Sequence, residues 1–199
     1  MTPPESAARP RRPPFARRPA KASYLLLSLV VLLLDQLSKG LIEARLPLFG
    51  RYEVVPGFLN LVHVRNRGVA FGLLSEHGSA SWGVLLLVVL GLGALTVVAI
   101  YFRRTPPTER LLLVSLALIM GGAVGNLVDR IGSGAVTDFV DAYYGTYHWH
   151  TFNVADSAIT IGIVLMLIDF VFAGGRTAEG DAPTGGERSV DSPSDSAAD

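Results

Sequence analysis

Residues 121–160 read GGAVGNLVDR, IGSGAVTDFV, DAYYGTYHWH and TFNVADSAIT, and this stretch decides the fold. Its four acids, two asparagines and one arginine stand between two strongly apolar runs. A charge beside apolar segments costs free energy unless it is paired or used, so the cluster predicts a functional site.

The composition of the chain points to a bilayer as its solvent. Half of the 199 residues are hydrophobic and only 17% are charged, a balance typical of small integral membrane proteins. The net charge is zero, which gives no reason to expect a nucleic-acid partner. The chain has no cysteine, so thiol nucleophiles, cysteine metal sites and disulfides are excluded.

Four apolar segments have lengths near the roughly 20 residues that cross a hydrocarbon core. The first runs on into Asp35 and Lys39 without a small-residue cleavage site, so we predict a retained helix and not a cleaved secretory signal. The sequence therefore predicts an all-α membrane protein with four transmembrane helices, at about residues 24–42, 82–102, 111–128 and 157–173.

The segments outside these spans differ in character. Residues 1–22 are basic and rich in proline, and residues 174–199 are rich in Gly, Ser, Pro and Asp, so both are predicted to be disordered tails around a membrane domain at 23–173. Residues 43–80 alternate in short pieces between Gly and Pro, which predicts a small extracytoplasmic β-element.

The distribution of basic residues predicts the orientation. Lys and Arg near membrane spans stay on the cytoplasmic side, and they concentrate in the first tail and in the turn at 103–110. Both termini are then cytoplasmic. With this topology the polar interruptions meet at the outer face, and they comprise Asp35 and Lys39, residues 66–72, residues 126–130 and Asp156.

Helical spacing predicts several pairs among these residues. Asp35 and Lys39 lie four apart and can form an ion pair. Asn126, Asp129 and Arg130 share a face if the third helix continues that far, and we expect Arg130 to neutralise Asp129 through a fork-shaped pair. Asn126 offers a donor and an acceptor for a peptide backbone. The alternative for both charge pairs is a purely structural helix end.

Two further acids are candidates for chemistry. Asp138 has apolar neighbours, and Asp156 follows Asn153 by three at the start of the last span, where it can alternatively serve only to stabilise the helix N-terminus. Two carboxylates that share one proton can act as acid and base, and so direct water at a peptide carbonyl without a metal or cofactor. We interpret Asp141 as an ordinary loop acid.

Other classes of function are weighed against this one. His148 and His150, with Asp138 or Asp156, form a possible zinc site, but no His-Glu-x-x-His helix accompanies them. A proton-coupled transporter predicts polar residues near the bilayer midplane and internal repeats, whereas the second and third spans are apolar at their centres. A scaffold gives no reason for Asp138 and Asp156 to flank the same boundary.

The motifs together resemble those of the lipoprotein signal peptidases, or type II signal peptidases, which are aspartyl proteases of the bacterial inner membrane. The resemblance covers about residues 24–173. It rests on DQLSK at 35–39, NRGVAFG at 66–72, GGAVGNLVDR at 121–130, VTDF at 136–139 and FNVADSAI at 152–159.

This resemblance implies an enzyme that cleaves lipid-modified prolipoproteins just before a diacylglyceryl-modified cysteine. Separately, we expect the protein to be a monomer. It implies Asp138 and Asp156 as the catalytic pair, Asn66, Asn126 and Arg130 as holders of the substrate chain, and a flap around Gly68 and Gly72. The supporting or substrate-contacting residues that it implies are Asp35, Lys39, Asn66, Gly68, Asn126, Asp129, Arg130 and Asn153.

Overall fold

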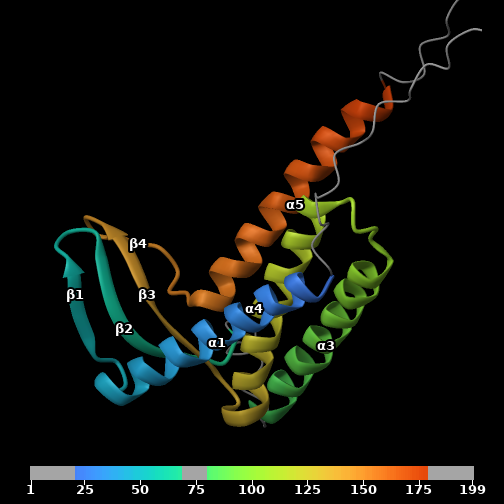
Figure 1. Cartoon of the computed structure of the whole chain (residues 1–199). Helices are drawn as coiled ribbons and strands as arrows, with labels where there is room; N and C mark the ends of the chain where they lie inside the picture. Colours follow the sequence, from blue (N-terminus) through green and yellow to red (C-terminus); the bar gives the residue numbers. More distant parts are fainter. Residues whose placement is uncertain (1–20, 69–79, 179–199) are drawn as a thin grey trace, which may run out of the picture.

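The computed structural model describes residues 21–68 and 80–178 (Figure 1). Gly72 and most of both expected tails lie outside these residues. The exceptions are residues 21–22 and 174–178, which are helical. In chain order the elements are α1 (Lys21–Arg45), β1 (Arg51–Val55), β2 (Leu59–Asn66), α3 (Ala80–Arg104), α4 (Arg110–Ser133), β3 (Val136–Tyr144), β4 (Tyr147–His148) and α5 (Val154–Ala178).

Four helices are long and apolar enough to cross a membrane, which confirms the predicted fold class. Their membrane-spanning parts are longer than the apolar runs alone, because each helix continues into polar residues at one or both ends. In particular, α4 extends to Ser133, so Asn126, Asp129 and Arg130 are all helical. The four parts cover Lys21–Arg45, Trp82–Arg104, Arg110–Ser133 and Val154–Phe172.

Helix α4 is the centre of the bundle and packs against α1, α3 and α5 (Figure 1). Small residues allow the close approach that the sequence predicted. A Cβ atom on Gly121 would lie 2.6 Å from the carbonyl oxygen of Ser28 in α1, and one on Gly125 would lie 2.5 Å from Oδ2 of Asp35. The glycines therefore fix how near Asp35 lies to α4.

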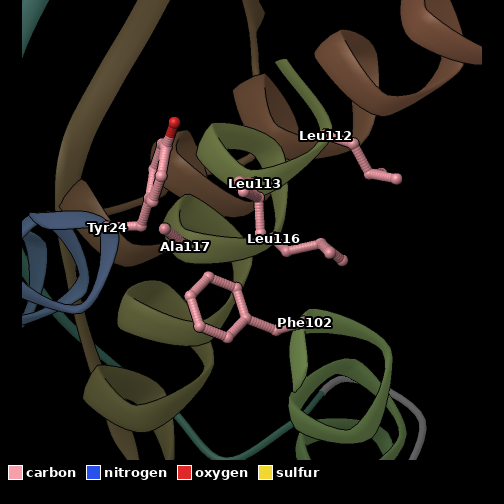
Figure 2. Close-up of a cluster of buried hydrophobic side chains, with 6 residues drawn as sticks. All are labelled: Tyr24, Phe102, Leu112, Leu113, Leu116 and Ala117. Carbon is pink, nitrogen blue, oxygen red and sulfur yellow. The ribbon is translucent and has the colours of Figure 1, made fainter. Parts of the chain in front are cut away.

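An apolar cluster holds the bundle together where α1 and α4 begin and α3 ends (Figure 2). Leu113 and Ala117 of α4 are completely buried in it, against Tyr24 of α1 and Phe102 of α3. Lipid is as apolar as leucine, so this cluster stabilises the bundle through tight packing more than through removal from water. The polar residues gather at the other end of the same helices.

A four-stranded antiparallel sheet in the order β1-β2-β3-β4 extends from that other end (Figure 1). It pairs the predicted strands of residues 43–80 with β3, which follows α4 in the chain. In the register of β2 and β3, Val64 lies opposite Asp138 and Asn66 opposite Val136. The interpretation of Asp141 as a loop acid is wrong, because Asp141 lies within β3 and is buried.

Candidate active site

The polar residues at the helix ends do converge, as the sequence predicted, because α1, α4 and α5 bring them to one place beside β2 and β3. They form two connected groups. The first is a closed cluster of charges between α1 and α4, and the second is a pair of acids that line a cavity.

The closed cluster is built around Lys39 of α1. Its Nζ atom lies 2.7 Å from Oδ2 of Asp35 and 2.7 Å from Oδ2 of Asp129, and it donates to Oδ1 of Asn126 at 3.1 Å. Gln36 donates to the other oxygen of Asp129 at 2.9 Å. Asp35 and Lys39 are buried, so the predicted pair exists and is an interior one, not a snorkelling helix end.

The expected pair between Asp129 and Arg130 is wrong. Adjacent residues of a helix point in different directions, so Asp129 faces α1 and meets Lys39 while Arg130 does not. Arg130 instead turns back along α4 and donates to the carbonyl oxygen of Asn126 at 3.1 Å. Its side chain also lines a different cavity from the one that contains the two acids.

Asp156 is fixed by the start of α5. Asn153 precedes this helix, and its Oδ1 accepts the N–H of Asp156 at 3.0 Å, while Oδ2 of Asp156 accepts the N–H of Asn153 at 3.2 Å. This reciprocal arrangement is a capping box. Asp35 accepts a further N–H of the same helix end, that of Ala155, at 2.9 Å. Asp156 therefore does stabilise the helix, and its Oδ1 remains for another role.

Three asparagines orient the two acids. Asp138 accepts from Nδ2 of Asn153 at 2.8 Å and from Nδ2 of Asn66 at 2.9 Å, and Asp156 accepts from Nδ2 of Asn126 at 2.8 Å. Asn126 also uses its oxygen to accept from Lys39. One N–H and the oxygen of Asn126 thus serve other side chains in this structure, and the expectation that Asn126 holds a substrate backbone stays a prediction.

Gly68 acts through Asn66. Its N–H donates to Oδ1 of Asn66 at 2.8 Å, which leaves the amide Nδ2 of Asn66 to face Asp138. Gly68 has a φ of 92°, a conformation that favours glycine. The rest of the expected flap lies outside the described residues.

Both acids open into one cavity of about 510 Å³. One wall comes from residues 149–152, which connect β4 to α5, and another from the exposed side of α5. No lysine or arginine lines it among the residues that the structure describes. The lining residues are Asn66, Asp138, Trp149, His150, Thr151, Phe152, Asp156, Ser157, Thr160 and Ile161.

The surroundings of Asp138 favour a bound proton. Burial raises the pKa of Asp138 above its usual range, the hydrogen bond from Asn66 opposes this, and the negative charge of Asp156 raises the pKa further. Because both oxygens of Asp138 accept an N–H, a proton must occupy one of the remaining lone pairs. This geometry suits an acid that donates into the cavity.

Asp141, three residues along the same strand, has the opposite character. Burial alone would raise its pKa, but hydrogen bonds with His148 and Asn60, each at 2.8 Å, lower the pKa of Asp141 overall. His148 faces Asp141, whereas His150 lines the acid-bearing cavity. The zinc alternative gains no support, since the described residues contain no group of three or more possible His, Cys, Asp or Glu ligands.

Sequence reasoning missed some residues of the site. Gln36 belongs to the motif at 35–39 but had no predicted role, although it joins Asp35 to Asp129. The wall at 149–152 carries no periodic pattern, and the sequence indicated His150 only as a possible metal ligand and Phe152 only as part of a motif.

Fold and site together define a four-helix membrane protein that holds two acids in one cavity at the end of its helices. The chain resembles two solved bacterial membrane enzymes. One has a TM-score of 0.66 and 30% identity, with 75% of this chain and 92% of that chain covered. The other has a TM-score of 0.68 and 27% identity, with coverage of 83% and 95%.

Curated proteins and a family model narrow the class. The chain is 46% identical to the lipoprotein signal peptidase of Solibacter usitatus over 142 residues, which are 71% of this chain and 86% of that protein. It is also 46% identical to the lipoprotein signal peptidase of Desulforapulum autotrophicum over 147 residues, which are 74% of this chain and 90% of that protein. The model of signal peptidase (SPase) II matches residues 27–172. The chain therefore belongs to the signal peptidase II family and is a membrane-bound peptidase.

Proposed function

We propose that this protein removes the signal peptide from lipid-modified prolipoproteins by cleaving just before the diacylglyceryl-modified cysteine. Its membership of the signal peptidase II family and the names of its relatives support the substrate class. The observation that carries the chemistry is the shared cavity, because Asp138 and Asp156 both face a space large enough for a peptide bond and a water molecule.

The two acids divide the proton transfers between them. Asp156 lies at the N-terminus of α5 and accepts hydrogen bonds from Asn126 and Asn153, which stabilise a negative charge. It removes a proton from water, whose oxygen forms a bond to the substrate carbonyl carbon, while Asp138 gives its proton to the carbonyl oxygen. The tetrahedral intermediate then collapses: the C–N bond breaks, Asp156 gives its proton to the leaving nitrogen, and Asp138 regains its own.

The closed cluster positions the base and does not itself react. Lys39 holds the oxygen of Asn126, which leaves the amide of Asn126 directed at Asp156. Asp35 stabilises the same helix end through the N–H of Ala155. In this proposal Asp35, Lys39 and Asp129 are positioning residues, and Asn66 and Asn153 position Asp138.

The active site belongs at the outer face of the bacterial cytoplasmic membrane. The basic turn between α3 and α4 marks the cytoplasmic side, and the acid-bearing cavity lies at the opposite end of α4. Both termini are then cytoplasmic, and the substrate reaches the cavity from the bilayer. The structure gives no support to the transporter alternative. The residues of the closed cluster and the two acids lie at one end of the helices and not at their centres.

The experiment is cleavage of a prolipoprotein by the purified protein in detergent, with the product analysed by mass spectrometry. We expect a fragment that begins at the lipidated cysteine, and much slower cleavage of the same precursor without its diacylglyceryl group. A metal chelator should leave the rate unchanged. Equal cleavage of both precursors would contradict the proposed substrate, and loss of activity with the chelator would contradict the two-acid chemistry.

A further inference from the structure

One face of α1 carries three ionisable residues that are four positions apart, and they are Asp35, Lys39 and Glu43. The first two are buried and belong to the closed cluster. Glu43 lies about one turn further toward the end of the helix, and it is exposed. The proposed mechanism gives Glu43 no role, so its contact with the rest of the protein needs an explanation.

Glu43 contacts β3 through one short hydrogen bond. The hydroxyl group of Thr137 donates to Oε1 of Glu43 at 2.5 Å. This distance is typical of a charge-assisted bond from a hydroxyl group to a carboxylate, which is stronger than a bond between neutral groups. Thr137 is only 2% exposed, so the bond ties a buried residue of the strand to the end of α1.

The position of Thr137 matters because Asp138 is the next residue. Successive side chains of a strand point to opposite faces of the sheet, so Asp138 faces away from α1 when Thr137 faces toward it. On that other side, Asn66 and Asn153 donate to the carboxylate and the acid-bearing cavity opens. The bond to Glu43 therefore restricts how far β3 shifts or rotates at Asp138.

Helix α1 also contacts the residue before the second acid. Oδ1 of Asp35 accepts the N–H of Ala155 at 2.9 Å, and Ala155 directly precedes Asp156. The same face of α1 thus holds the neighbour of Asp156 and, about two helical turns further on, the neighbour of Asp138. A bond that only satisfied a buried hydroxyl group would give no reason for this parallel.

We propose that α1 is a brace that fixes the spacing of the two acids, with Asp35 holding Asp156 and with Glu43, through Thr137, holding Asp138. This role rests on the proposed function, since the spacing matters only if the acids share the proton transfers. Glu43 and Thr137 are positioning residues, because they act through Asp138. A shift of about 1 Å in a reacting group can lower a rate by up to about 10²-fold, so loss of the brace should affect kcat more than KM.

The first test compares variants of Thr137 in prolipoprotein cleavage by the full chain in detergent. Thr137→Val removes the hydroxyl group at nearly constant size, and we expect kcat to fall about tenfold while KM changes less than about twofold. Thr137→Ser keeps the hydroxyl group and should restore kcat to within about threefold of the unmodified value. Glu43→Ala changes an exposed residue, so it tests the same bond without altering the interior, and it should add nothing to Thr137→Val.

Tyr143→Phe is the matched control. The hydroxyl group of Tyr143 donates to Glu53 at 2.7 Å, so this variant also removes a hydroxyl–glutamate bond of β3, but one far from Asp138 along the strand. We expect its kcat to stay within about twofold of the unmodified value. An equal fall in kcat in Tyr143→Phe and Thr137→Val, or a failure of Thr137→Ser to restore kcat, would overturn the brace.

A second test needs no substrate. The pKa of Asp138 is measured by isotope-edited infrared spectroscopy with and without Asp156→Asn, and the difference reports how strongly the two acids interact. We expect this difference to be smaller when Thr137→Val is also present. An equal difference in both backgrounds would overturn the brace. Absence of cleavage by the unmodified protein would instead contradict the proposed function, so the two failures are distinguishable.

Discussion

Two groups of acids lie side by side at the same end of the helices, and they differ in what surrounds them. In the closed cluster, Lys39 lies 2.7 Å from both Asp35 and Asp129. In the open pair, Asp138 and Asp156 face a cavity that no described lysine or arginine lines. Burial with a countercharge makes acids structural, whereas burial without one, beside room for water, prepares them for proton transfer.

The largest expected effect comes from neutralising the open pair. Asp138→Asn or Asp156→Asn removes a proton donor or acceptor, and we expect the kcat for prolipoprotein cleavage to fall by about 10²–10⁴-fold. Asp141→Asn, a buried acid of the same strand as Asp138, is the matched control and should stay within about fivefold of the unmodified rate. If the control loses as much activity as Asp138→Asn, the distinction between these acids is wrong.

Breaking the closed cluster should mainly reduce stability. Lys39→Met leaves the buried Asp35 and the partly buried Asp129 without their cation, and we expect a loss of about 3–5 kcal/mol in the free energy of unfolding, measured by denaturant titration in detergent. Adding Asp129→Asn to that variant should restore part of the loss, because one uncompensated charge is removed. A Lys39→Met variant as stable as the unmodified protein would show that the cluster is not structural.

A smaller effect on activity is expected at Asn126, which connects the closed cluster to the open pair. Asn126→Ala removes the hydrogen bond to Asp156, and we expect kcat to fall about 10–100-fold while the KM changes less. Asn60→Ala is the matched control, because Asn60 is also a buried asparagine and donates to Asp141 instead. Similar kcat values in the two variants would remove Asn126 from the positioning of the base.

The smallest effect is a dependence of stability on pH. Because the folded pKa of Asp138 is raised, its stabilising contribution is complete below its unfolded pKa of 3.8 and is lost as pH rises through the folded pKa. Asp141 has a lowered pKa, so its contribution is present above 3.8 and is lost as pH falls through the folded pKa. The free energy of unfolding is measured against pH for each variant and for the unmodified protein. The pH dependence that Asp138→Asn removes should lie above pH 3.8, and the one that Asp141→Asn removes should lie below it.

The sequence predicted the parts of this site that follow from local spacing. Asp35 and Lys39 are four positions apart, which places them on one helical face. The number of membrane spans in the chain predicted that Asp156 lies at the same side of the membrane as Asn126. The partner of Asp129 was missed because contacts between helices depend on how each helix is rotated about its axis. Tight packing at Gly121 and Gly125 sets that rotation, and the sequence only indicated that close approach was possible.

The sheet shows a second limit. Residues 136–144 form the long strand β3, but its acids interrupt the apolar alternation by which strands are recognised. Asp138 and Asp141 are tolerated there because Asn66, Asn153, Asn60 and His148 provide hydrogen bonds from other elements. Such partners, distant along the chain, are visible only once the fold is known.

The most direct test of the central claim is a titration of Asp138 by isotope-edited infrared spectroscopy, which detects the protonated carboxyl group. The account predicts that the pKa of Asp138 lies above 3.8, and that Asp156→Asn lowers the pKa of Asp138 because a nearby negative charge is removed. An unchanged pKa of Asp138 in the Asp156→Asn variant would contradict the claim that these two acids work as one proton-sharing pair.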